Sequence, residues 1–211
     1  MKKCIKDRHD YIMQYCKDKH VLHLGCIGNS YKSTSEYEPW LHKEICEVAK
    51  ECVGLDSDKE RIPFVEERTK SKIFFGDVQY FDLSRKFDVI VGGEIIEHLD
   101  NFKSFFESIK KHMNKESLLV LTTPNAFNFS NLIRVIFTGK PIFDKDHVVY
   151  FDLFTLGQML KRHGFKLVAH YYNTEVAPQR IRNMIIRGLG KIFPILNLDL
   201  MIVAKCVESA E

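Results

Sequence analysis

Short apolar segments alternate with helical patterns through most of the chain. Five of these segments run into glycine, aspartate or a proline-containing turn, and they cover residues 21–24, 51–55, 72–75, 87–91 and 118–122. Continuous apolar runs of this length are typical of strands that are covered on both faces. The pattern therefore predicts a parallel sheet.

The stretches between these strands favour helices. Residues 41–50 and 59–69 are polar and compatible with helix, and apolar residues recur at helical spacing over 102–113. Strands that alternate with helices predict an α/β, Rossmann-like, doubly wound sheet with helices on both faces.

The last third of the chain differs. An apolar stripe predicts a helix over 153–164, a strand follows over 165–172, and an amphipathic helix is expected near 179–191. Residues 198–204 alternate along the chain, which favours a strand at an edge or antiparallel to its neighbours. We expect seven strands, the last one antiparallel, in a single domain spanning 1–211.

Composition narrows the class of protein. The 211 residues are 45% hydrophobic, enough to fill a core, and 31 basic against 28 acidic residues give a net charge of +3, too weak to indicate a nucleic-acid partner. The six cysteines include no Cys-x-x-Cys pair, and the N-terminus lacks the apolar run of a signal peptide. No stretch approaches the length of a spanning helix. We expect a cytoplasmic protein with free thiols.

Candidate chemistry follows the strands, because open α/β sheets bind ligands at the carboxyl ends of their strands. Residues 25–30, Gly-Cys-Ile-Gly-Asn-Ser, follow the first strand, Asp56 the second and Asp77 the third. Asp56 can accept hydrogen bonds from a ribose diol, and Asp77 with the Val78 N–H can contact an adenine. Each signal alone is also typical of a turn or a helix cap; the three together favour a nucleotide site.

The fourth strand precedes the most specific segment, Gly92-Gly93-Glu94-Ile95-Ile96-Glu97-His98. It places two carboxylates and an imidazole at the mouth of an apolar sheet, and such crowding usually requires a ligand. The alternative is a helix start enriched in acids by its dipole.

These residues together resemble the class I S-adenosylmethionine-dependent methyltransferases, over about residues 18–172. The branch is similar to the ubiquinone-biosynthesis O-methyltransferases, which residues 147–151 also match. The resemblance implies S-adenosyl-L-methionine as cofactor. The residues that it assigns to cofactor binding are His23, Gly25, Cys26, Gly28, Asp56, Ser57, Asp77, Val78, Gly93 and Glu94.

Three positions depart from the pattern of that family. His23 stands where an acid is usual, and Ile27 and Asn29 replace the second and third glycines of its loop. A β-branched residue does not easily adopt positive φ, so we expect the loop to be reshaped around Gly28. The longer stretch that follows carries Tyr31, Tyr37 and Trp40, which could cover the cofactor or anchor a surface loop.

Methyl transfer to a hydroxyl benefits from a general base. His98 is the first candidate and His147 the second, each with a structural histidine as the alternative. The resemblance also implies that Glu94, Glu97 and His98 could hold a divalent metal. Because Glu94 has a competing role beside the cofactor, we predict no metal.

The acceptor is expected to be a small molecule, methylated on oxygen, of a surface-glycan or quinone type. An apolar insert over about 126–150 is predicted to form its lid, and contact of this insert and of the basic helix near 179–191 with a membrane surface is the alternative.

Two other functions compete. A nucleotide-dependent oxidoreductase would carry Gly-x-Gly-x-x-Gly and no closing antiparallel strand, and both expectations fail. A non-catalytic binding protein is favoured by His23, Ile27 and Asn29.

Overall fold

The computed structural model describes residues 4–5, 7–28, 40–141, 144–173 and 188–207. Its strands are β1 (Cys4–Ile5), β2 (His20–Leu24), β3 (Glu51–Asp56), β4 (Lys72–Phe75), β5 (Phe87–Gly93), β6 (Met113–Pro124), β7 (Phe165–Asn173) and β8 (Asp199–Cys206). Its α-helices are α1 (Arg8–Cys16), α2 (Leu41–Val48), α3 (Ile62–Thr69), α4 (Phe102–Lys111), α5 (Phe129–Thr138) and α6 (Leu153–Arg162).

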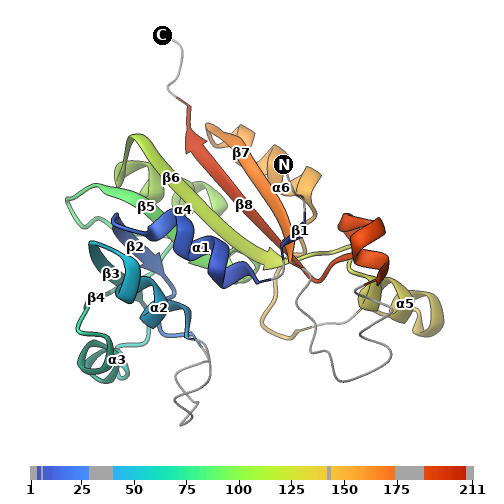
Figure 1. Cartoon of the computed structure of the whole chain (residues 1–211), viewed down its shortest axis with the longest axis horizontal. Coiled ribbons are helices and arrows are strands. Elements are labelled where there is room, and N and C mark those ends of the chain that lie inside the picture. The colour runs from blue at the N-terminus through green and yellow to red at the C-terminus, as the bar shows by residue number, and fades with distance from the viewer. Residues whose placement is uncertain (1–3, 6, 29–39, 142–143, 174–187, 208–211) are drawn as a thin grey trace.

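All of these strands belong to one sheet, in the order β1-β7-β8-β6-β5-β2-β3-β4 (Figure 1). Only β8 runs antiparallel to its neighbours β6 and β7, and the other pairings are parallel. The predicted doubly wound α/β sheet with an antiparallel last strand is therefore confirmed.

The sheet differs from the prediction in three places. An eighth strand, β1, pairs with β7 at the edge, and two residues are too short a segment to show periodicity. The last strand is antiparallel, as expected, but it lies between β6 and β7 and has no polar face. Leu200–Ala204 are all buried, because both faces of the sheet are covered. The fifth predicted strand begins earlier, at Met113, which pairs with Phe87.

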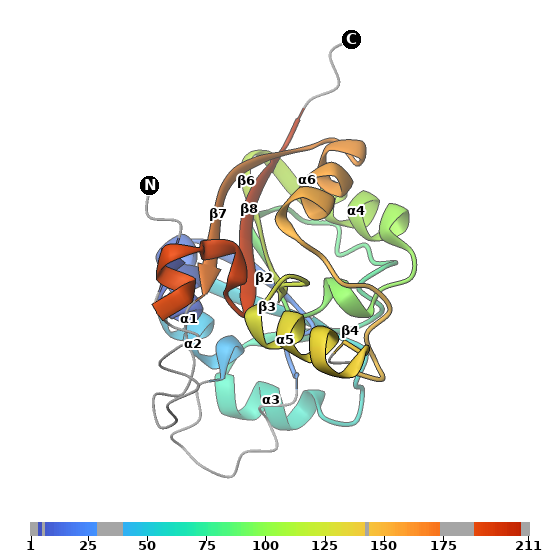
Figure 2. The same cartoon turned by 90° about the vertical axis from the view of Figure 1, so that its right-hand side faces the viewer.

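Helices cover both faces of the sheet, as expected (Figure 2). On one face, α1 and α2 bury Ile12, Cys16 and Ile45 against the valines of the central strands. On the other face, α4 and α6 bury residues that include Phe106 and Leu160. The sheet is thus shielded from water on both sides, which is why its strands read as continuous apolar runs.

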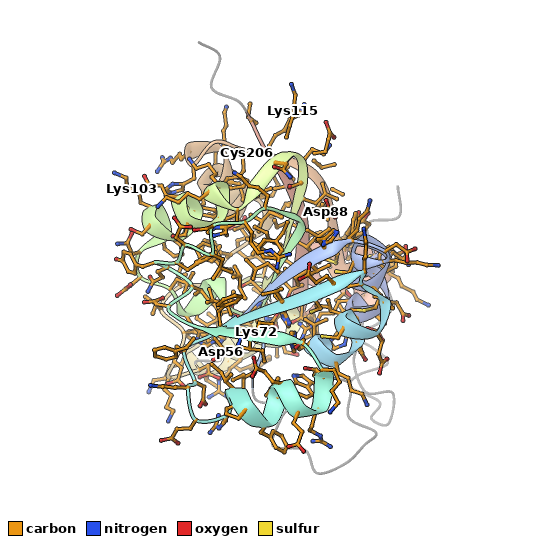
Figure 3. The ribbon with its side chains drawn as sticks, turned by 90° about the vertical axis from the view of Figure 1, so that its left-hand side faces the viewer. Asp56, Lys72, Asp88, Lys103, Lys115 and Cys206 are labelled. Atoms are coloured by element: carbon orange, nitrogen blue, oxygen red, sulfur yellow. The ribbon has the colours of Figure 1, made fainter. Side chains whose placement is uncertain are left out.

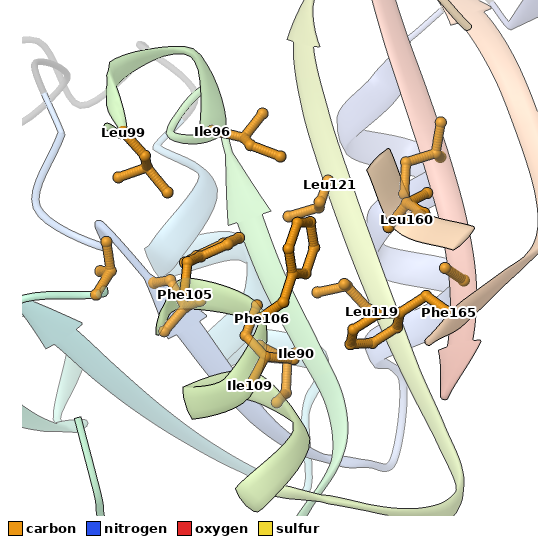
Figure 4. Packing of buried hydrophobic residues seen from close by; sticks show 14 of the residues in the cluster. Ile90, Ile96, Leu99, Phe105, Phe106, Ile109, Leu119, Leu121, Leu160 and Phe165 are labelled. Carbon is orange, nitrogen blue, oxygen red and sulfur yellow. The ribbon is translucent and has the colours of Figure 1, made fainter. Parts of the chain in front are cut away.

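The larger core cluster lies under α4. Phe105, Phe106 and Ile109 recur at helical spacing and are fully buried against Ile90, Leu119 and Leu121 of the sheet (Figure 4). The helix begins at a cap in which the Asn101 side chain accepts a hydrogen bond from the Ser104 N–H at 3.1 Å. This packing fixes the positions of β5 and β6, whose carboxyl ends carry Gly93 and Pro124.

Two predicted segments lie partly outside the described residues. Within the insert over 126–150, the structure has helix α5, and residues 144–150 form neither helix nor strand; 142–143 lie outside the described residues. Of the helix expected near 179–191, only 188–191 are described, and they belong to a helical stretch over 188–192. Among the described helices, none combines the length and the apolar character needed to cross a bilayer.

The core makes a direct prediction about stability. Phe106 is fully buried, so Phe106→Ala should lower the free energy of unfolding by about 3–5 kcal/mol, through lost burial and the cavity left behind. Urea unfolding followed by circular dichroism measures this loss. Phe154→Ala is the matched control, because Phe154 is 70% exposed and its loss should change stability by at most about 0.5 kcal/mol. Equal effects of the two variants would contradict the assigned core.

Candidate functional site

A cleft of about 1170 Å³ opens at the carboxyl ends of β2, β3 and β5. All twelve predicted site residues line it: His23, Gly25, Cys26, Gly28, Asp56, Ser57, Asp77, Val78, Gly93, Glu94, His98 and His147. Figure 3 labels Asp56 at this end of the sheet and Asp88, near the start of β5, at the opposite end. The structure thus brings the predicted residues together, and their individual roles stay predictions.

Asp56 is the most constrained of these residues. Its side chain is buried, and its two oxygens accept the N–H groups of Ile27 and Asp58, each at 2.9 Å. A carboxylate oxygen has two acceptor sites, so each oxygen keeps one for a further donor. Asp56 can therefore accept one hydrogen bond from each hydroxyl of a vicinal diol.

The loop after β2 turns at two glycines. Gly25 and Gly28 have φ of +65° and +53°, and a Cβ at Gly25 would overlap the Ile95 side chain. Ile27 is not among the residues with positive φ; it is 1% exposed and packs with Cys26 and Trp40. The loop is therefore shaped around Gly28, as expected, and Ile27 contributes its N–H rather than conformational freedom.

The aromatic stretch is only partly described. Trp40 is buried, lines the cleft and donates its indole N–H to the Cys26 carbonyl at 3.3 Å, so it anchors the loop. Asn29, Tyr31 and Tyr37 lie outside the described residues. Asp77 is exposed and accepts the Gln79 N–H at 2.8 Å, and the neighbouring Val78 is buried.

A three-residue ion network forms another wall of the cleft. The Arg8 guanidinium lies 2.9 Å from Glu94 and 3.1 Å from Asp199, and Asn173 donates to Asp199 at 3.2 Å. Glu94 itself has a φ of +50°, and its N–H donates to Thr122. Burial in the cleft raises the pKa of Glu94, and Arg8 opposes that rise.

Glu97, His98 and His147 meet at the far end of the cleft. The Glu97 side chain is 1% exposed, and neither of its oxygens has a hydrogen-bond partner among the described residues. Burial raises the pKa of Glu97 to about 7. His98 faces His147 edge-on with ring centres 4.8 Å apart, and the N–H groups of Val148 and Val149 hold this segment on the Glu97 carbonyl.

These three residues could hold a cation, since one ligand atom from each lies within 4.8 Å of the others. The sequence groups Glu94, Glu97 and His98 instead. In the structure Glu94 pairs with Arg8 instead, and His147 is the third residue of the group with Glu97 and His98.

The charge of the cleft fits a cationic ligand. Two arginines, Arg8 and Arg61, face eight carboxyl groups in its lining, those of Asp56, Asp58, Asp77, Glu94, Glu97, Asp144, Asp146 and Asp199. Burial raises the pKa of two of these groups, Glu94 and Glu97. With the Asp56 acceptor pair, this surface suits a nucleoside that carries a positive charge on sulfur.

The lining residues that sequence reasoning missed include Arg8, His9, Asn173 and Asp199. Arg8 begins α1, a helix with no clear apolar stripe. Asn173 ends β7 and Asp199 begins β8, and only the order of the strands in the sheet brings these two residues to the cleft. Reading the amino end of an antiparallel strand as part of the ligand edge would have found Asp199.

Comparison with known proteins agrees with this geometry. The family model described as a methyltransferase domain matches residues 18–170. The chain belongs to this methyltransferase family. The class I S-adenosylmethionine-dependent methyltransferase domain expected from the sequence is therefore confirmed, and with it the expected cofactor.

Individual relatives are more distant. The ubiquinone biosynthesis O-methyltransferase of Pelagibacter ubique is 26% identical over 114 residues, 52% of this chain and 43% of that protein. The chain spans less than half the length of the curated relatives it matches.

Solved structures share the fold. An S-adenosylmethionine-dependent methyltransferase from Archaeoglobus fulgidus aligns with a TM-score of 0.61 at 22% identity, over 94% of this chain and 91% of that one. The magnesium protoporphyrin IX methyltransferase of Synechocystis, solved with bound S-adenosylhomocysteine, has a TM-score of 0.64 at 10% identity, over 94% and 82%.

The buried Glu97 makes stability depend on pH. Its pKa rises from 4.5 to about 7 on folding, so the folded protein holds the proton more tightly than the unfolded chain. That stabilisation is complete below about pH 4.5 and is lost as the pH rises through 7. Glu97→Gln cannot ionise, and at about pH 8 it should be more stable than the parent, by on the order of 3 kcal/mol.

Urea unfolding in chelator-treated buffer, at about pH 4 and pH 8, checks this expectation. The two proteins should have equal stability at the lower pH. Glu107→Gln is the control, because Glu107 is exposed and should show no pH-dependent difference. A stability difference for Glu97→Gln that is the same at both pH values would contradict the assigned burial.

Proposed function

We propose that the chain, as one domain, transfers a methyl group from S-adenosylmethionine to a hydroxyl oxygen of a small molecule. One observation carries this proposal. The predicted nucleotide-binding side chains lie in the same acid-lined cleft as His98, whose Nδ1 contacts a backbone carbonyl and leaves Nε2 to act as a base. The cytoplasmic location stays a prediction.

The cofactor end of the cleft would be built from the ends of three strands. Asp56 would hold the two ribose hydroxyls, and Asp77 with the Val78 N–H would contact the adenine. The turn at Gly25, Cys26 and Gly28, together with Gly93 and Glu94, would line the methionine part. When bound, the cofactor supplies a methyl group already activated by the positive sulfur.

His98 is the proposed base. Its Nδ1 lies 2.8 Å from the Asp146 carbonyl oxygen, which can only accept, so Nδ1 carries the ring proton. Nε2 is then an unprotonated acceptor that can take the proton of a hydroxyl. His147 packs edge-on against this ring and fixes its orientation.

The acceptor would reach the cleft along the insert. Pro124 lines the cleft, and α5 begins five residues later. Among the described residues of α5, Ile136 and Phe137 are 66% and 79% exposed. An exposed apolar surface on the helix that follows the cleft residue Pro124 favours a quinone-type precursor over a glycan. The O-methyltransferase among the relatives agrees with transfer to oxygen.

A non-catalytic binding protein is the alternative, favoured by the three sequence departures His23, Ile27 and Asn29, of which Asn29 lies outside the described residues. The Ile27 N–H still reaches Asp56, so this departure leaves the ribose acceptors in place. Turnover therefore separates the alternatives better than binding does.

Cofactor binding is tested by calorimetry with S-adenosylhomocysteine. Asp56→Ala should weaken binding about tenfold to a hundredfold, because two charge-assisted hydrogen bonds to the ribose are lost. Asp100→Ala is the control, since Asp100 is exposed and outside the cleft lining. Unchanged affinity in Asp56→Ala would refute the ribose assignment, and no binding by the parent protein would refute the cofactor.

Catalysis is tested by transfer of labelled methyl to a panel of phenols, sugars and amines. We expect a phenol to be methylated, and His98→Ala to lower kcat about 10²- to 10⁴-fold while S-adenosylhomocysteine affinity stays within about twofold. His147→Ala should have the smaller effect. A larger loss in His147→Ala would move the base role to that residue, and methylation of amines alone would overturn transfer to oxygen.

A further inference from the structure

Two histidines and two cysteines gather between the sheet and α2. His23 comes from β2, His42 and Cys46 lie one turn apart on α2, and Cys52 is near the start of β3. The side chains of His23, His42 and Cys52 are buried, and Cys46 is half-buried. The reaction proposed above uses neither the thiols nor His42.

The distances suit one shared cation. His42 Nδ1 lies 3.2 Å from His23 Nδ1 and 3.7 Å from Cys52 Sγ. In a tetrahedral zinc site with Zn–N of about 2.05 Å and Zn–S of about 2.3 Å, ligand atoms lie about 3.3 Å (N to N) and about 3.6 Å (N to S) apart. Cys46 Sγ lies 3.8 Å from His42 Nε2, and His42, Cys46 and Cys52 each offer a ligand atom within 4.8 Å of the others. His23, which contacts His42 Nδ1, is the candidate for a fourth ligand.

A chain of hydroxyl groups fixes the tautomer of His42. Thr69 Oγ1 donates its single proton to the Val65 carbonyl at 2.8 Å, so at 2.7 Å it accepts from Ser71 Oγ. Ser71 Oγ, 2.9 Å from His42 Nε2, then accepts the Nε2 proton. Neutral His42 therefore presents an unprotonated Nδ1 to the cluster, as metal-binding histidines do when a neighbouring oxygen holds their other nitrogen.

The side chains are of the types that zinc takes in structural sites, imidazole nitrogens and cysteine sulfurs. Two thiolates would neutralise a dication, and its charge would offset the cost of burying them.

We propose that His42, Cys46 and Cys52, with His23 drawn in as the fourth ligand, form a tetrahedral site for a thiophilic divalent cation of the zinc type, which joins β2, α2 and β3 beneath the cofactor cleft. The site gives a reason for His23, where the family resemblance leads one to expect an acid. It is independent of the proposed acceptor and of the Glu97, His98 and His147 group.

Cobalt(II) is the probe, because thiolate ligands give it an intense near-ultraviolet charge-transfer band that oxygen and imidazole ligands do not. The reduced full chain, stripped with chelator, should bind one equivalent with this band and with the visible spectrum of a tetrahedral ion. Zinc should displace the cobalt and abolish both signals. Absence of the thiolate band in the folded parent protein would overturn the proposal.

Variants assign the ligands. Cys52→Ser and Cys46→Ser should each weaken cobalt binding at least about tenfold and reduce the band, whereas Cys206→Ser, a half-buried cysteine elsewhere, should leave both unchanged. Glu97→Gln should also leave the band unchanged, which separates this site from the other cation group. Circular dichroism shows whether a variant folds.

His42→Ala, measured in the same way, keeps the assignment testable if a cysteine variant does not fold. An undiminished band with unchanged cobalt affinity in the folded cysteine variants, or unchanged cobalt affinity in His42→Ala, would refute the ligand set.

Discussion

The hydrogen bond between the Asp56 carboxylate and the Ile27 N–H is the contact on which the site depends. β2 and β3 are paired in parallel with Leu24 beside Leu55, so the residues that follow each strand emerge next to each other. The Gly25 N–H donates to the Leu55 carbonyl at 2.9 Å, and the Ile27 N–H reaches Asp56. One buried carboxylate thus sets the shape of two loops and keeps two acceptor sites for a ligand.

The reversed strand completes the cleft. In a parallel sheet only carboxyl ends reach the ligand edge, but β8 runs the other way and brings its first residue, Asp199, to that edge. There Asp199 and Glu94 both pair with Arg8 at the start of α1. A single guanidinium therefore joins the first helix, the end of β5 and the last strand.

The sequence predicted the sheet, its antiparallel last strand and the residues of the cleft, because those features rest on local patterns: apolar runs, glycine turns and acids at strand ends. It did not predict β1, which is too short to show a period, or Arg8, whose partners lie 86 and 191 positions away. The sequence also did not predict that His147, and not Glu94, lies with Glu97 and His98. That arrangement depends on the hydrogen bond from the Val148 N–H to the Glu97 carbonyl.

The departures from the family pattern follow one logic. The loop needs a backbone N–H at position 27, and isoleucine supplies it as well as glycine does, while its side chain fills the space beside Trp40 and Cys26. Position 23 faces away from the large core under α4, toward α2, where His42 meets it. In both places a residue that contacts the cofactor cleft also takes part in packing beneath it. Asp56 is thus held by a backbone N–H as a glycine loop would hold it, while the residues packed beneath the loop, Ile27 and His23, differ from the family pattern.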